Sequence, residues 1–184
     1  PEFAIRRAVV GEVQPKALVS LVLLACLVGA ATQIWPGAGI ASDRIVGTED
    51  YRVRIVPVAS GLDTPWGMTF LDRDRILLTE KPGRLRVVEG GKLLPRPVAG
   101  LPAVRVHGQG GLLDVTTHPQ FASNGLIYWS FANGEGADVG TEVARGKLSG
   151  DAAAGYRLDQ VEVIFRQQPK NTGSPHFGSR LVWD

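Results

Sequence analysis

The sequence predicts an all-β fold made of repeated four-stranded units, a pattern typical of a β-propeller. The 184 residues include 23 glycines and 12 prolines, which favours short strands joined by turns over long helices. Similar apolar segments open successive units at intervals of about 45 and then about 68 residues: 66–70, 111–115 and 179–183. A β-sandwich, which also contains many short strands, is the alternative.

The composition is that of an ordinary globular domain and argues against a nucleic-acid partner. Hydrophobic residues make up 44% of the chain and charged residues 21%. The formal net charge is only +2, and the basic residues form no cluster of the kind that binds nucleic acid. Cys26 is the only cysteine, so an intramolecular disulfide is impossible.

Residues 1–41 are predicted to be a signal peptide and leader, and residues 42–184 to be the amino-terminal part of a propeller domain. Basic residues precede an apolar segment at 17–31, which is shorter than the roughly 20 residues of a membrane span. That order is typical of a secretory signal, and small residues favour cleavage after Ala41. Lipoprotein processing at Cys26 and a buried helix are the alternatives.

The strand candidates of the first unit follow an irregular start. Residues 42–48 resemble a leader, and residues 51–58 alternate between polar and apolar side chains as a half-buried strand does. Residues 93–98 contain two prolines, which suits a protected edge or an outer connection. Strands rich in large apolar residues and separated by turn sequences are predicted at 66–71, 75–79 and 84–88.

The second unit repeats this organisation with longer connections. Strands are predicted at 111–117, 126–131, 141–148 and 161–166, and loops at 119–125, 132–140 and 167–175. A strand beginning at Gly178 is predicted to open a third unit. The chain therefore covers about the first two blades and the start of a third.

A glycine-rich stretch at 107–114 is the strongest candidate for a site. It contains three glycines, with Gln109 between two of them and an apolar strand behind. Glycine allows a backbone to approach a flat ligand closely, although a glycine-rich turn before a strand is also common. Residues 176–183 have the same layout, in which a polar His176 precedes a glycine and an apolar strand.

Five motifs in order resemble the amino-terminal part of the glucose/sorbosone dehydrogenase family: 62–68, 79–85, 107–114, 118–121 and 176–182. The most similar branch is that of the soluble aldose sugar dehydrogenases, which depend on pyrroloquinoline quinone (PQQ). The resemblance runs from about Val56 to Asp184. It implies a six-bladed β-propeller with PQQ and Ca²⁺ as cofactors, most of whose binding residues are expected beyond residue 184.

The resemblance also implies roles for two residues. Gln109 is expected to lie beside the quinone and the sugar as a cofactor-binding residue, and His176 is expected to be the catalytic base. No metal ligand is predicted within the chain. Pro175 stands where the glucose-oxidising branch has an aspartate, which favours an enzyme with a broader range of aldoses.

The two residue types suit the chemistry. Oxidation of the C1 hydroxyl of a sugar to a lactone removes a hydride, which a quinone accepts, and a proton. An imidazole, with an ordinary pKa of about 6.5, can take that proton. A neutral amide can donate a hydrogen bond to a quinone or sugar oxygen.

Several other polar or aromatic residues have simpler interpretations. His107 is interpreted as part of a solvated loop, His118 as structural, and Arg180 mainly as a structural ion-pair partner. The sequence 72–74 lacks the glycine and late glutamate of a calcium loop. The tryptophans in strand patterns are expected in the core: Trp66, Trp129 and Trp183.

The function predicted from these features is PQQ-dependent oxidation of aldoses in the periplasm or outside the cell. The partners are the aldose substrate and an external electron acceptor, with no nucleic acid and no stable membrane span after processing. Calcium-assisted lactonases share such folds but need inward carboxylates, which the predicted blade starts lack. The remaining alternative is a non-catalytic exported propeller that binds carbohydrate or a protein.

Overall fold

The computed structural model describes residues 3–10, 44–170, 172 and 176–184. It divides the chain into a larger unit that holds Ala59–Asp184 and a smaller unit within Ile5–Val58. Across the described ranges, no helix combines the length and the apolar character that crossing a bilayer requires.

The amino-terminal sheet has three strands in the order β1-β3-β2. They are β1 (Phe3–Val10), β2 (Arg44–Gly47) and β3 (Arg52–Leu62). The strand predicted at 51–58 is confirmed, and within the segment interpreted as a leader at 42–48, Arg44–Gly47 forms β2, which pairs antiparallel with β3. Cys26 and Ala41, on which the signal-peptide prediction turned, lie outside the described residues.

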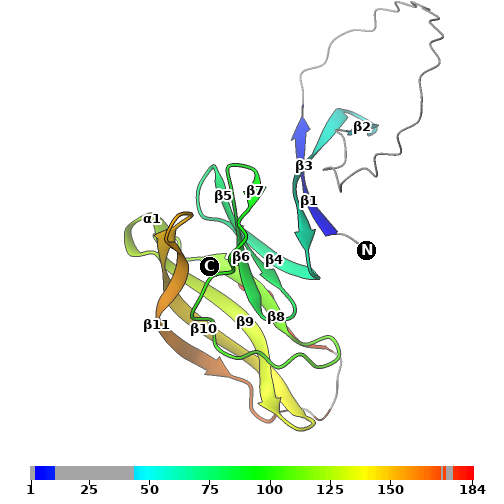
Figure 1. Ribbon diagram of the computed structural model, residues 1–184. Coiled ribbons are helices and arrows are strands. Elements are labelled where there is room, and N and C mark those ends of the chain that lie inside the picture. The colour runs from blue at the N-terminus through cyan, green and yellow to red at the C-terminus, as the bar shows by residue number, and fades with distance from the viewer. Residues whose placement is uncertain (1–2, 11–43, 171, 173–175) are drawn as a thin grey trace, which may run out of the picture. The chain divides into compact units, whose positions relative to one another are not determined.

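The first repeat of the larger unit is an antiparallel sheet in the order β4-β5-β6-β7 (Figure 1). Its strands are β4 (Pro65–Phe70), β5 (Arg75–Glu80), β6 (Arg84–Glu89) and β7 (Lys92–Leu93), which confirms the three predicted strands. After β7, the N–H groups of Leu94 and Val98 still bond to β6. The two prolines between them have no N–H to donate, so the regular ladder stops and an edge connection remains.

The second repeat is an antiparallel sheet in the order β11-β10-β9-β8 (Figure 1). Its strands are β8 (Leu112–Thr117), β9 (Leu126–Glu135), β10 (Asp138–Asp151) and β11 (Gly155–Arg166). A single helical turn, α1 (Phe121–Asn124), lies in the predicted loop after β8. The loop predicted at 132–140 is wrong, because β9 and β10 pair as far as Glu135 and Asp138, and Val139 is fully buried.

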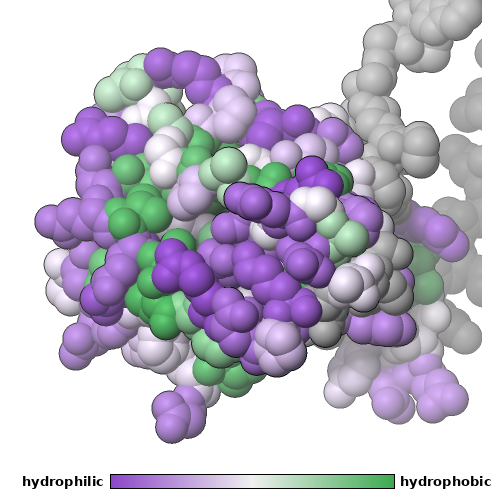
Figure 2. All heavy atoms as spheres, turned by 90° about the horizontal axis from the view of Figure 1, so that it is seen from below, coloured by the Kyte–Doolittle hydropathy of each residue, from purple (hydrophilic) through white to green (hydrophobic). Residues whose placement is uncertain are grey.

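The core lies between the two repeats and consists of large aliphatic and aromatic side chains. Trp129 and Phe131 of β9 pack with Leu77 of β5 and Leu85 of β6. Trp129 is therefore in the core as predicted, whereas Trp66 and Trp183 are 50% and 42% exposed and the prediction is wrong for them. Figure 2 shows a face on which hydrophilic side chains surround smaller apolar patches.

A buried hydroxyl closes a β-bulge in the first strand of each repeat. The ladder shifts register between Pro65 and Met68 in β4 and between Leu112 and Val115 in β8. In β4 the free N–H of Gly67 donates to Thr79 Oγ1 at 2.9 Å. In β8 the N–H of Asp114 donates to Ser130 Oγ at 3.0 Å, so a neighbouring side chain satisfies the main-chain group that each bulge leaves unpaired.

The same hydroxyls connect each repeat to the next segment of chain. Thr79 Oγ1 donates to the Leu113 carbonyl at 2.5 Å, and Ser130 Oγ donates to the Ser179 carbonyl at 2.7 Å. The segment 179–183 therefore lies against the second repeat as β8 lies against the first. The strand predicted to begin at Gly178 is nevertheless absent, because these contacts run through side chains and form no backbone ladder.

Replacement of Thr79 by valine tests this hydroxyl relay. Thr79→Val keeps the shape but leaves the Gly67 N–H and the Leu113 carbonyl unpaired in the interior, so the free energy of unfolding should fall by about 2–4 kcal/mol. Urea denaturation of the full-length protein measures the change. Thr69→Val is the matched control, because no hydrogen bond of that half-buried hydroxyl occurs within the described residues, and an equal loss there would contradict the relay.

Candidate active site

Gln109 lies at the tip of a tight turn that two backbone hydrogen bonds close. The N–H of Gly110 donates to the His107 carbonyl at 2.8 Å, and the N–H of His107 donates back at 3.3 Å. Gly108 has a φ of +54°, which favours glycine. The Lys81 ammonium at the end of β5 donates to the Gly108 carbonyl at 2.6 Å, so the turn is attached to the first repeat.

The other two glycines are explained by contacts within the protein. A Cβ atom on Gly110 would lie 2.8 Å from Cε2 of the Phe177 ring and 2.9 Å from Cβ of Ala132. A Cβ atom on Gly111 would overlap the Lys81 carbonyl. The sequence indicated room for a flat ligand, but at these two positions it is the chain itself that approaches closely.

The turn brings Gln109 to His176, and this contact unites the two residues that the sequence singled out. Gln109 Oε1 accepts the main-chain N–H of His176 at 3.0 Å. His176 has a φ of +67°, which is uncommon for a residue with a side chain. Both residues are exposed, and neither the Gln109 amide nitrogen nor the His176 ring has a hydrogen-bond partner within the described ranges. These groups are free to contact a ligand.

The chain after His176 is held by Asp114, which the sequence did not single out. The Leu181 N–H donates to Asp114 Oδ2 at 2.9 Å, and Arg180 Nη1 lies 3.4 Å from Asp114 Oδ1. The structural pairing predicted for Arg180 is therefore confirmed. Asp114 is a buried carboxylate in β8, so the expectation that the predicted blade starts lack inward carboxylates is wrong for the second repeat, and a carboxylate among apolar neighbours was an available signal.

His118 has the structural role expected of it. Its Nδ1 accepts the Gln120 N–H at 3.0 Å and lies 2.9 Å from the Asn124 amide nitrogen. The ring packs against Tyr128 and edge-on against Trp183, at centroid distances of 6.2 and 5.2 Å. His107 contributes its backbone to the turn and is half-buried, so the solvated-loop interpretation holds only in part.

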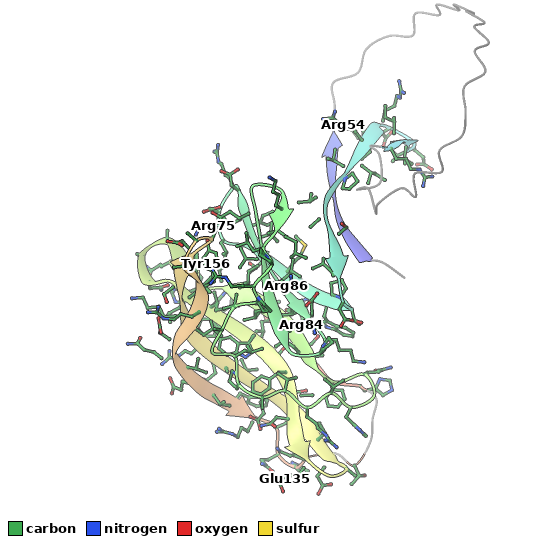
Figure 3. The ribbon with its side chains drawn as sticks, viewed as in Figure 1. Arg54, Arg75, Arg84, Arg86, Glu135 and Tyr156 are labelled. Carbon is green, nitrogen blue, oxygen red and sulfur yellow. The ribbon has the colours of Figure 1, made fainter. Side chains whose placement is uncertain are left out.

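A buried carboxylate ends β5, directly before Lys81. Glu80 is fully buried and accepts hydrogen bonds from Arg84, from Arg86 and from the N–H of Asp63. Figure 3 shows the two arginines near one another on the first repeat. Burial raises the pKa of the Glu80 carboxyl, but these donors outweigh it, so the pKa lies below its ordinary value and the group stays charged.

Within the described residues, no group of three or more His, Cys, Asp or Glu side chains could hold a metal ion. Asp72 forms an ion pair with Arg75 at 2.7 Å and caps the turn by accepting the Asp74 N–H. The ion pair and these hydrogen bonds lower the pKa of Asp72. The sequence 72–74 is thus a capped turn, and calcium remains a prediction that these residues do not test.

The two sheets and the site define an all-β, propeller-like protein in which polar loop residues gather at the start of β8. The model of the glucose/sorbosone dehydrogenase family matches residues 62–184. The chain therefore belongs to this family, and the resemblance drawn from the five motifs is confirmed.

Two curated relatives are each 40% identical to this chain. The aldose sugar dehydrogenase YliI of Escherichia coli matches over 134 residues, which cover 72% of this chain and 35% of the relative. An uncharacterized protein of Synechocystis matches over 150 residues, which cover 77% of this chain and 35% of that protein. The chain thus spans about a third of the length of the relatives it matches.

Solved structures give the same fold. A glucose dehydrogenase has a TM-score of 0.62 at 48% identity, with 67% of this chain and 38% of that chain covered. The apo form of the soluble aldose sugar dehydrogenase from E. coli has a TM-score of 0.61 at 42% identity, with 66% and 35% covered. The PQQ-bound aldose sugar dehydrogenase from Streptomyces coelicolor has a TM-score of 0.56 at 24% identity, with 76% and 37% covered, and supports the fold alone.

Gly110→Ala tests the close packing beneath the turn. The added methyl group would force the Phe177 ring away, and the free energy of unfolding should fall by about 1–3 kcal/mol. Urea denaturation of the full-length protein measures this loss. Gly47→Ala in β2 is the control, because no atom lies within 4 Å of its Cβ position, and a loss at Gly110 no larger than at Gly47 would contradict the packing.

Proposed function

We propose that the full-length protein is a PQQ-dependent oxidoreductase that oxidises the C1 hydroxyl of aldose sugars to lactones. Membership of the glucose/sorbosone dehydrogenase family and relatives named as aldose and glucose dehydrogenases support this assignment. The observation that carries it is the hydrogen bond from the main-chain N–H of His176 to Gln109 Oε1, which brings together a histidine and a glutamine from segments far apart in sequence.

In this proposal His176 is the general base. Its backbone is anchored by Gln109, while its exposed imidazole makes no hydrogen bond within the described residues. A proton on the C1 hydroxyl needs an acceptor at hydrogen-bond distance as the C1 hydride leaves. The left-handed backbone at His176 sets the direction of its Cα–Cβ bond, and so limits the positions that the imidazole can reach.

The described residues fit one edge of a flat, anionic quinone. The side-chain oxygen of Gln109 accepts the His176 N–H, which leaves the amide NH₂ group to donate to a quinone or sugar oxygen. The Lys81 ammonium, bound to the neighbouring Gly108 carbonyl, adds positive charge beside the turn. When bound, PQQ supplies the acceptor for the hydride.

The remaining parts of the proposal follow from the family resemblance. They are a complete six-bladed propeller, Ca²⁺ as a second cofactor, an external electron acceptor, and export to the periplasm or medium by the segment 1–41. A broad range of aldoses follows from Pro175, which lies outside the described residues.

His176→Ala tests the base in the full-length enzyme supplied with PQQ and Ca²⁺. Loss of the proton acceptor should lower kcat for aldoses by about 10²–10⁴-fold, while PQQ binding stays near the wild-type value. Dye reduction across a panel of aldoses and titration of PQQ measure the two effects. Turnover close to wild type in the variant would remove His176 from this role, and a folded wild-type protein that binds sugar without reducing dye would favour a non-catalytic propeller.

Gln109→Glu separates the two functions of the amide. The variant keeps an oxygen that accepts the His176 N–H but replaces the free donor with a negative charge, so the Kd for PQQ should rise at least about tenfold with little change in stability. PQQ titration and thermal denaturation measure the outcome. Gln120→Glu adds the same charge on the exposed turn after β8 and serves as the control. If Gln109→Glu left the Kd for PQQ unchanged, the cofactor would have to bind away from Gln109.

A further inference from the structure

Two side chains from one stretch hold the His176 segment at both of its ends. Gln109 accepts the N–H of His176, and Asp114 accepts the N–H of Leu181. Both pairs are 67 positions apart in sequence. Residues 109–114 and 176–181 therefore run parallel and in register, joined by side-chain to main-chain bonds.

The anchor at Asp114 has little freedom to move. Its side chain is almost completely buried, at 4% exposure, and its own N–H is bonded to Ser130 Oγ. A Cβ atom on Gly67 would lie 2.7 Å from Asp114 Oδ1, so the absence of a side chain at Gly67 makes room for the carboxylate against β4. Ser130 also holds the Ser179 carbonyl, next to the anchored residues 180 and 181.

The repeat itself does not require a carboxylate at this position. Gly67 occupies the same place in the bulge of the first repeat, and its N–H bonds to Thr79 as that of Asp114 bonds to Ser130. A buried carboxylate costs free energy unless hydrogen bonds or charges offset the loss of water. Its cationic partner, Arg180, has a side chain that is 76% exposed, which makes that ion pair weak.

We propose that Asp114 is a positioning residue for His176, which acts by fixing the Leu181 N–H and with it the chain that follows the histidine. This inference rests on the proposed function, because it assigns His176 as the base. Gln109 fixes the start of the segment and Asp114 its end. The distance from the imidazole to a bound sugar is therefore set by a side chain that touches neither the sugar nor the cofactor.

The test compares two substitutions in the full-length enzyme loaded with PQQ and Ca²⁺. Asp114→Ala removes the acceptor, and Asp114→Asn keeps an oxygen for the Leu181 N–H while it removes the charge. Because a misplacement of about 1 Å can cost about 10²-fold in rate, we expect Asp114→Ala to lower kcat about 10–100-fold, with KM and the Kd for PQQ within about threefold of wild type. Asp114→Asn should restore kcat to within about threefold of wild type.

Hydrogen exchange provides a readout that does not depend on activity. Amides in the peptide 176–183 should exchange faster in Asp114→Ala than in the wild type, and at the wild-type rate in Asp114→Asn. Tyr156→Phe is the control for general destabilisation. Its hydroxyl bridges Arg75 and Glu89 in the region seen in Figure 3, so its loss should alter exchange there and leave kcat unchanged.

The outcomes separate this inference from the proposed function. If the wild-type enzyme reduces no dye with any aldose, the proposed function fails, and the exchange data alone then decide whether Asp114 orders the segment. Unchanged exchange in Asp114→Ala overturns the inference. So does a loss of kcat in Asp114→Asn as large as in Asp114→Ala, or an equal loss in Tyr156→Phe.

Discussion

The structure depends on a hydrogen-bond relay in which one buried hydroxyl serves two strands. Thr79 and Ser130 each accept the unpaired N–H of a β-bulge and donate to a carbonyl of the following segment. An apolar side chain of the same size could fill the space but would leave two main-chain groups unsatisfied in the interior. The relay therefore fixes how the first repeat meets β8 and how the second repeat meets the chain after His176.

The positions of the candidate site residues are determined by these buried hydrogen bonds. Lys81 attaches the turn of Gln109 to the first repeat, while Ser130 and Asp114 attach the chain after His176 to the second. The exposed residues themselves make few contacts, so the buried strands beneath them determine the geometry. This division suits a loop site, in which a rigid sheet carries residues that must remain accessible to a ligand.

The sequence predicted β4, β5 and β6 well, because each is a short run rich in large apolar residues between turn sequences. The prediction failed at 132–140, because the glycines and polar residues there indicated a loop. These residues form the hairpin between β9 and β10, which is held by cross-strand pairing that a local pattern does not show. Gln109 and His176 could be paired only through ordered motifs, since a contact over 67 positions leaves no local pattern. Asp114 could be noticed as a carboxylate in a buried strand, but its partners on the distant segment 180–181 could not be read from the sequence.

The relay also sets where the modules of such a protein begin and end. Each hydroxyl belongs to one repeat, yet the hydrogen bond that it donates goes to the segment after that repeat, which is β8 for Thr79 and residues 179–183 for Ser130. A four-stranded sheet taken alone would carry a donor for the segment after it but lack the donor that the preceding sheet supplies. The unit that is complete in hydrogen bonds is therefore offset from the visible four-stranded sheet, because it includes the hydroxyl of the preceding repeat.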